Sequence, residues 1–183
     1  MEIILVRHGE ASSSWGQSSD PGLSDLGNSQ AEECAKKLYN LKNIESFNLI
    51  SSPLLRAKQT AKPLSEKINS SIQINPLFSE IPSPGISISE RKEWLSKIFQ
   101  MNLRDLGAAQ KKWKSAIISE IENISKPSII FSHFMVINII VSYLTNNDLV
   151  VTFYPDNCSI TKLLKNKKIK LIHLGSELQT KIN

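Results

Sequence analysis

Short runs of apolar, β-branched residues recur along the chain, and most are followed by a segment whose apolar positions repeat with helical spacing. The runs at 2–6, 47–51 and 128–131 predict buried strands, because brief apolar runs bounded by turn residues are typical of such strands. A shorter run at 72–74 predicts a weak strand. Strands that alternate with helical segments indicate an α/β fold.

Helical spacing predicts five helices, over 24–40, 53–68, around 94–99, around 113–124 and over 134–144. Ser24 is the expected N-cap of the first, because its hydroxyl can accept from the unpaired amides of the first turn. Pro63 is expected to kink or restart the second helix, since proline lacks the amide that an inner turn needs. Gly107 is expected to separate the third helix from the fourth.

The last apolar segments alternate with polar residues and predict two strands, Ser159–Leu164 and Ile169–Leu174, joined through Asn166 and Lys167. Such a hairpin adds an antiparallel edge to a mostly parallel sheet. The chain has 183 residues, without an internal repeat or a linker, and a typical domain holds roughly 100–200 residues. Residues 1–183 are therefore expected to form a single domain.

Composition narrows the class of protein. Hydrophobic residues make up 40% and charged residues 21%, which excludes disordered and fibrous chains. No apolar run approaches the ~18 residues of a membrane helix, so no membrane association is expected. The apolar run before Arg7, residues 3–6, is too short for the apolar region of a signal peptide. Two cysteines, Cys34 and Cys158, show no metal-binding spacing and indicate free thiols in a reduced, cytoplasmic compartment.

The net charge of +5 favours anionic partners, either nucleic acid or phosphorylated metabolites. Lysines are dense between Lys162 and Lys170. They straddle the predicted hairpin without interleaved aromatic residues, and lysines commonly protect exposed sheet edges. Nucleic acid is therefore not an expected partner.

The residues that carry chemistry stand just after the predicted strands. His8 and His133 follow the first and third of the longer apolar runs, and Arg7 lies beside His8. Arg56 lies in the first turn of the helix after the second strand. Open α/β sheets bind ligands at these strand ends, and guanidinium groups match phosphate oxygens two at a time. A phosphoryl group is the expected ligand.

Four motifs occur in order at these positions. They are Arg7-His8-Gly9-Glu10, then Leu23-Ser24 with Gly27, Gln30 and Ala31, then Ser51-Ser52-Pro53 with Arg56, Ala57, Gln59, Thr60 and Ala61, and finally Ser132-His133 followed by Asn157-Cys158-Ser159. In this order the chain resembles the histidine phosphatase superfamily, also called phosphoglycerate mutase-like, from the first strand to about Leu164. The resemblance implies a three-layer sandwich, with helices on both faces of the mixed sheet.

The resemblance also implies a mechanism, in which His8 attacks phosphorus and becomes a phosphohistidine. Arg7, Arg56 and His133 would bind the phosphoryl oxygens, and Glu80 would serve as proton donor. The implied site needs neither a metal ion nor a cofactor. These roles suit phosphoryl transfer, whose transition state spreads charge over the equatorial oxygens, so that fixed cations serve it well.

The sequence departs from the family pattern after the second histidine, where Phe134 replaces the usual glycine. Phe134 is expected to narrow the mouth of the site or to form an apolar wall, and Ser14 of the polar loop is a further candidate for substrate contact. Glu10 could be a second acid, although a structural role is preferred. The segment that begins at Glu80 and continues to Arg91 also differs from the mutase pattern.

The expected function is a phosphomonoesterase that acts on a phosphorylated small molecule or a phosphoprotein. Two alternatives stay open: phosphotransfer of the phosphoglycerate mutase type, and a catalytically weak protein that binds a phosphorylated ligand. The sequence names neither the substrate nor the oligomeric state.

Overall fold

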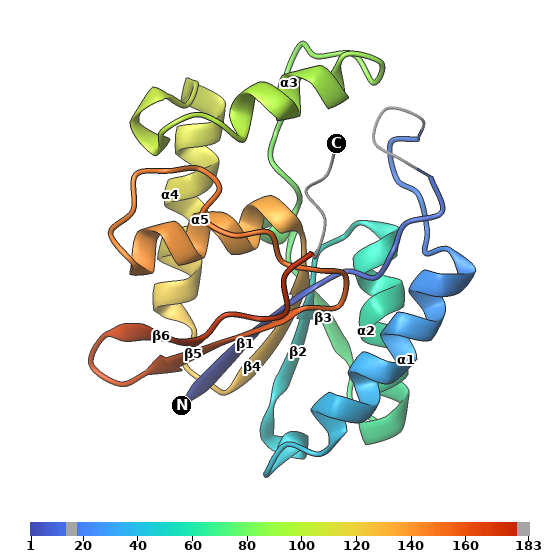
Figure 1. Cartoon of the computed structure of the whole chain (residues 1–183). Helices are drawn as coiled ribbons and strands as arrows, with labels where there is room; N and C mark the ends of the chain where they lie inside the picture. Colours follow the sequence, from blue (N-terminus) through green and yellow to red (C-terminus); the bar gives the residue numbers. More distant parts are fainter. Residues whose placement is uncertain (14–17, 179–183) are drawn as a thin grey trace.

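The computed structural model describes residues 1–13 and 18–178, and within them a mixed sheet has the strand order β3-β2-β4-β1-β5-β6 (Figure 1). The strands are β1 (Glu2–Arg7), β2 (Asn48–Ser51), β3 (Ile72–Ile74), β4 (Ser128–Ser132), β5 (Ile160–Lys165) and β6 (Ile169–His173). Strands β3, β2, β4 and β1 are parallel, and β5 is antiparallel to both β1 and β6. The mostly parallel sheet with an antiparallel edge is thus confirmed.

Helices cover both faces of this sheet, as expected (Figure 1). They are α1 (Asp25–Tyr39), α2 (Leu55–Ile68), α3 (Arg91–Ile98), α4 (Ala108–Asn123) and α5 (Phe134–Leu144), with short 3₁₀ turns η1 (Ile44–Ser46), η2 (Pro76–Phe78) and η3 (Leu103–Asp105). Helices α1 and α2 pack on one face, and α4 and α5 on the other. Helix α3 packs over α5. The fold is therefore the expected three-layer α/β arrangement.

Burial on both faces explains why the sequence of strand β1 is apolar without interruption. Its residues Ile3, Ile4, Leu5 and Val6 are all 0% exposed. Ile3 and Leu5 belong to the cluster beneath α4 and α5, whereas Ile4 and Val6 belong to the cluster beneath α1 and α2. A central strand covered on both faces requires apolar residues at both sets of alternating positions.

Two helix predictions have different outcomes. The Ser24 hydroxyl accepts from the Gly27 amide at 2.9 Å, which confirms the N-cap of α1. The expected restart at Pro63 is wrong, because α2 continues through it from Leu55 to Ile68. The buried face that includes Ala61 and Leu64 packs against the sheet on either side of Pro63, and this packing outweighs the loss of one backbone hydrogen bond.

Helix length and hydropathy bear on membrane association. Over the ranges given above, no helix is both long and apolar enough to cross a bilayer.

Candidate active site

Strand register brings the chemistry-bearing residues to one edge of the sheet. Arg7 of β1 pairs with Ser132 of β4, and Phe131 of β4 pairs with Ser51 of β2. The chain continues from these strands directly into His8, His133 and Ser52. The amide of His8 donates to the Ser132 carbonyl at 3.0 Å, which fixes the two histidine segments against each other.

The side chain of His8 has a defined orientation. Its Nδ1 lies 2.7 Å from the carbonyl oxygen of Gly9, so Nδ1 carries the proton and donates. The lone pair on Nε2 then accepts from Arg56 Nε at 3.1 Å. His8 is only 5% exposed, and burial together with the charges of Arg56 and Arg7 holds its pKa well below the ordinary 6.5. His8 is therefore a neutral imidazole whose Nε2 faces a cation.

Arg7 and Arg56 converge on this imidazole from β1 and α2. Arg7 Nη1 donates to the Pro155 carbonyl at 2.7 Å, and its guanidinium carbon lies 5.5 Å from the centre of the Phe134 ring. Arg7 Nε is buried without a hydrogen-bond partner among the described residues. Buried guanidinium donors that lack a partner favour an anion as ligand.

His133 approaches His8 from the end of β4. The two rings meet edge to face, with 5.2 Å between their centres. His133 Nε2 lies 2.7 Å from Ser52 Oγ, which also accepts from the Leu54 amide at 3.2 Å. The Ser52 hydroxyl can therefore donate a hydrogen bond to Nε2, and in that tautomer the ring N–H is at Nδ1. Nδ1 is likewise buried without a partner in the part of the chain described.

Burial determines the charge state of His133 as well. Its pKa lies well below 6.5, chiefly because the ring is buried and further because His8, Arg56 and Arg7 lie nearby. Neutral His133 offers one N–H at Nδ1, and Arg7 offers the N–H at Nε. Both residues are neighbours of His8, and phosphoryl oxygens could accept from these two unpaired nitrogens.

Glu80 joins these residues from the loop between η2 and α3. The carboxylate is half-buried, and its Oε1 accepts from the Ile81 amide at 3.1 Å. Burial raises the pKa of Glu80 above 4.5, although Arg56, Arg91 and Arg7 oppose this rise. The expected acid therefore lies within electrostatic reach of both expected phosphate-binding arginines. A raised pKa suits a carboxyl group that must hold a proton before donating it.

Glu10 contacts helix α1 and its N-cap. Its Oε1 accepts from the Ser24 hydroxyl at 2.7 Å, and its amide donates to Gln30 Oε1 at 2.8 Å. Both partners belong to α1 or its cap. These contacts support the structural role that the sequence favoured for Glu10.

Phe134 is buried beside Arg7. Phe134 is 0% exposed and lies between Arg7, Phe99 at 5.1 Å and Tyr154 at 5.7 Å between ring centres. Its ring lies against the Arg7 guanidinium, and the expected wall at the mouth of the site stays a prediction. Ser14 lies outside the described residues.

Three residues near this site have contacts that the sequence did not predict. Asp20 Oδ1 accepts from the Leu55 amide at 2.8 Å and lies 3.9 Å from Arg56 Nη1, so it fixes the start of α2. Ser52 holds His133, and the Arg91 charge acts on Glu80. Ser52 and Arg91 were noted only as parts of motifs. Nothing in the spacing of Asp20 indicates that its loop folds back to α2.

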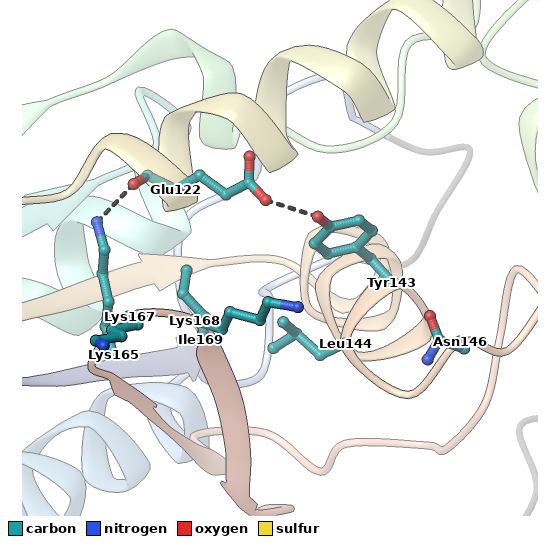
Figure 2. A pocket seen from close by; sticks show the side chains of 8 residues that line it. All are labelled: Glu122, Tyr143, Leu144, Asn146, Lys165, Lys167, Lys168 and Ile169. Atoms are coloured by element: carbon teal, nitrogen blue, oxygen red, sulfur yellow. Dashed lines mark hydrogen bonds between the residues drawn. The ribbon is translucent and has the colours of Figure 1, made fainter.

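The turn of the C-terminal hairpin lies beside the N-terminal end of β1, whereas the candidate site lies at the C-terminal ends of the parallel strands. Lys165, at the end of β5, pairs with the N-terminal end of β1 and donates through Nζ to the Glu122 and Ile124 carbonyls at 2.5 and 2.7 Å. Lys165 and Glu122 line a hollow of about 450 Å³. In this hollow the Glu122 carboxylate also accepts from the Tyr143 hydroxyl (Figure 2). Lys165 thus secures the end of α4.

In residues 1–13 and 18–178, no three or more His, Cys, Asp or Glu side chains form a group that could hold a metal ion. The side chains assembled at the candidate site carry imidazole, guanidinium and carboxyl groups.

The sequence also matches a known protein family. The family model "histidine phosphatase superfamily (branch 1)" matches residues 3–174. None of the curated proteins matches the sequence significantly.

Solved structures share the fold at low sequence identity. A mycobacterial glucosyl-3-phosphoglycerate phosphatase has a TM-score of 0.73 at 16% identity, covering 96% of this chain and 99% of its own. The phosphoserine phosphatase of Entamoeba histolytica has a TM-score of 0.71 at 21% identity, covering 96% of both chains. A proposed alpha-ribazole-5'-P phosphatase of Escherichia coli has a TM-score of 0.75 at 19% identity, covering 99% of both. With a family model that matches nearly its whole length, the chain belongs to the histidine phosphatase superfamily.

Proposed function

We propose that this protein is a phosphomonoesterase and that His8 is its nucleophile. The proposal rests on the groups that surround the His8 imidazole. Its Nε2 faces Arg56, and two neighbouring residues, Arg7 and His133, each have a buried nitrogen without a partner among the described residues, Arg7 Nε and His133 Nδ1. A tetrahedral phosphoryl group would satisfy both donors while its phosphorus faces Nε2.

The first half of the reaction transfers the phosphoryl group to His8. Neutral His8 attacks phosphorus through Nε2, the P–O bond to the leaving group breaks, and Glu80 donates its proton to the departing oxygen. Arg7, Arg56 and the His133 N–H hold the three remaining oxygens. A fixed donor of this kind is typically worth about 2.7–4 kcal/mol of transition-state stabilisation.

The second half releases phosphate. The Glu80 carboxylate takes a proton from water, whose oxygen attacks phosphorus as the bond to Nε2 breaks. Glu80 is again protonated and His8 is again neutral, so the cycle closes without a metal ion. The arginines remain charged throughout, which suits a loose transition state that needs positioning and electrostatic stabilisation.

The proposed substrate class is a phosphorylated small molecule, with a phosphoprotein as the alternative. The superfamily and the structural neighbours named above support phosphatase activity, and each neighbour's substrate is known only for that protein. We also propose that residues 1–183 form one cytoplasmic catalytic domain. A mutase and a weak binder remain the competing functions.

A phosphoenzyme assay tests this proposal. Purified protein is incubated in EDTA with phosphomonoesters of alcohols, sugars and amino acids, and the products and any acid-labile phosphoenzyme are measured. We expect phosphate release, and we expect both release and phosphoenzyme to vanish in folded His8→Ala. His173→Ala is the matched control, because His173 is exposed on β6. Isomerised products would favour a mutase, while binding without turnover would favour a ligand-binding protein.

A further inference from the structure

The two cysteines of the chain line one pocket. Cys34 projects from α1 and is 2% exposed, and Cys158, just before β5, is half-buried. They share a cavity of about 350 Å³ with Asp156, Asn157, Lys37 and other residues of α1. The sequence separates these cysteines widely and gives no sign that the fold brings them together.

Their side chains are also in mutual contact within the protein. Cys34 belongs to the apolar cluster beneath α1 and α2, and Cys158 packs against the same cluster. A hydrogen bond with the Cys158 thiol, together with burial, raises the pKa of the Cys34 thiol well above 9.0. Cys158 is therefore the sulfur that a small oxidant meets first, and Cys34 is the buried sulfur next to it.

The backbone of Cys158 is attached to the candidate active site. Its amide donates to the Arg7 carbonyl at 3.1 Å and lies 3.4 Å from the His8 carbonyl, while the Arg7 amide donates to Ser159 at 3.2 Å. Cys158 has a φ of 56°, in the left-handed region that side chains rarely adopt. A change at the Cys158 sulfur that moves this backbone therefore moves Arg7 and His8.

We propose that Cys34 and Cys158 are a redox modification site, which a peroxide converts to an intramolecular disulfide. The Cys158 sulfur attacks a peroxide oxygen, the O–O bond breaks, and hydroxide leaves with the thiol proton as water. The resulting sulfenic acid is attacked by the Cys34 sulfur, so that an S–S bond forms, the S–O bond breaks and a second water leaves. Two thiols lose two electrons in total, and one hydrogen peroxide becomes two waters.

The disulfide is reversible by thiols and connects α1 to the segment that holds Arg7. Thiol pairs of this kind in a reducing compartment act as transient sensors rather than as permanent crosslinks. Resting on the proposed function, we further infer that the disulfide lowers phosphatase activity by displacing the Arg7–His8 backbone. A misplacement of about 1 Å can cost on the order of 10²-fold in rate.

Mass spectrometry tests the chemical part without any assay of activity. Reduced protein is treated with hydrogen peroxide, denatured, alkylated and weighed. We expect monomeric protein that has lost two hydrogen atoms and takes up no alkyl group, with restoration by dithiothreitol. In Cys34→Ala we expect dimedone to trap a sulfenic acid on Cys158. Two alkylated thiols after treatment, sulfinic acid as the sole product, or a disulfide between two chains would each overturn the proposal.

An aryl phosphate assay of the same samples tests the consequence for activity. We expect the oxidised protein to lose ~10²-fold in kcat/KM and to recover with dithiothreitol. Cys34→Ala cannot form the disulfide, so we expect it to lack the loss of kcat/KM that the disulfide causes in the wild type. Full activity in the disulfide form would overturn the link to the site. Inactivity of the reduced protein would contradict the proposed function and leave the mass result standing.

Discussion

Arg56 combines two contacts that a lysine cannot make together. Its Nε donates to His8 Nε2 at 3.1 Å, and its Nη1 lies 3.9 Å from Asp20 Oδ1. The planar guanidinium fixes both directions at once, whereas an ammonium group is a point charge on a flexible chain. Arg56 therefore orients the imidazole before substrate arrives and can bind phosphoryl oxygens afterwards.

We expect Arg56→Lys to lower kcat/KM by about 10²- to 10³-fold, the loss typical of removing one positioned donor. The far-ultraviolet circular dichroism spectrum is expected to stay unchanged. Arg104→Lys is the control, because the side chain of Arg104 is 74% exposed and lies 3.3 Å from Asp148. An unchanged kcat/KM in Arg56→Lys would place this arginine outside the reaction.

Glu80 is the residue whose role depends on the leaving group. Its carboxyl group is half-buried and its pKa is raised. At a given pH, the fraction of molecules with a protonated Glu80 is therefore larger than it would be for a solvated carboxyl group. An alkoxide needs that proton in order to leave, whereas an acidic phenol leaves without it. The two classes of substrate therefore separate proton donation from binding.

We expect Glu80→Gln to slow phosphoenzyme formation from an alkyl phosphate by ~10²- to 10⁴-fold, the usual contribution of general acid catalysis. The burst with an aryl phosphate is expected to change much less. Pre-steady-state bursts are the measurement, because loss of Glu80 also slows attack of water on the phosphoenzyme. Equal and small effects on both substrates would exclude Glu80 as the acid, and Glu10 would then be tested.

At the scale of elements, helix α1 is held unusually close to the loop that contains His8. A Cβ atom added to Gly27 would overlap the Glu10 carbonyl oxygen, and one added to Gly9 would lie 2.6 Å from the Gly27 carbonyl oxygen. The obstacles are backbone atoms, which cannot rotate away. The two glycines therefore set the distance between α1 and the Arg7-His8-Gly9-Glu10 loop.

We expect Gly27→Ala to lower the free energy of unfolding by about 1–3 kcal/mol, the usual cost of overpacking, as measured by urea denaturation. Activity is expected to fall as well, because displacement of Glu10 shifts His8. Ser29→Ala is the matched control on the same helix, since Ser29 is exposed. Wild-type stability of Gly27→Ala would show that α1 can move without disturbing the loop.

The periodicity of the sequence predicted the elements better than it predicted their contacts. Apolar runs located β1, β2 and β4, because a strand buried on both faces has a sequence that few other structures share. Pro63 misled the prediction, since local propensity does not include the packing that holds α2 together. The wider lesson is that tertiary burial can override a local helix breaker.

For the whole molecule, the motifs predicted that His8, Arg56 and His133 would meet, and the strand register brings them together. The contacts of Asp20 with α2 and of Cys34 with Cys158 depend on how loops return to helices, and no period or spacing encodes such a return. Contacts of that kind could therefore not be predicted from the sequence.

The pH dependence of stability tests the buried histidines in the context of the whole molecule. Their pKa values lie well below 6.5 in the folded protein, so below pH 6.5 the unfolded chain binds protons that the native protein refuses. The contribution of the two histidines to the free energy of unfolding is therefore fully present above pH 6.5. It falls as pH decreases, by up to about 1.4 kcal/mol per pH unit for each histidine. Glu80 has the opposite sign, because its raised pKa weakens the native state as pH rises above about 4.5.

We expect His8→Asn to be less sensitive to acid than the wild type, since Glu80 is common to both proteins and only one buried imidazole has been removed. Urea denaturation between pH 7 and pH 5 should show a slope shallower by as much as ~1.4 kcal/mol per pH unit. His173→Asn, which alters an exposed residue, is expected to keep the wild-type slope. Identical slopes in all three proteins would mean that His8 is protonated as readily in the native state as in the unfolded chain. That result would show that burial and the charges of Arg56 and Arg7 do not lower the pKa of His8, so the imidazole would lose its unprotonated Nε2 as pH falls through the ordinary histidine range.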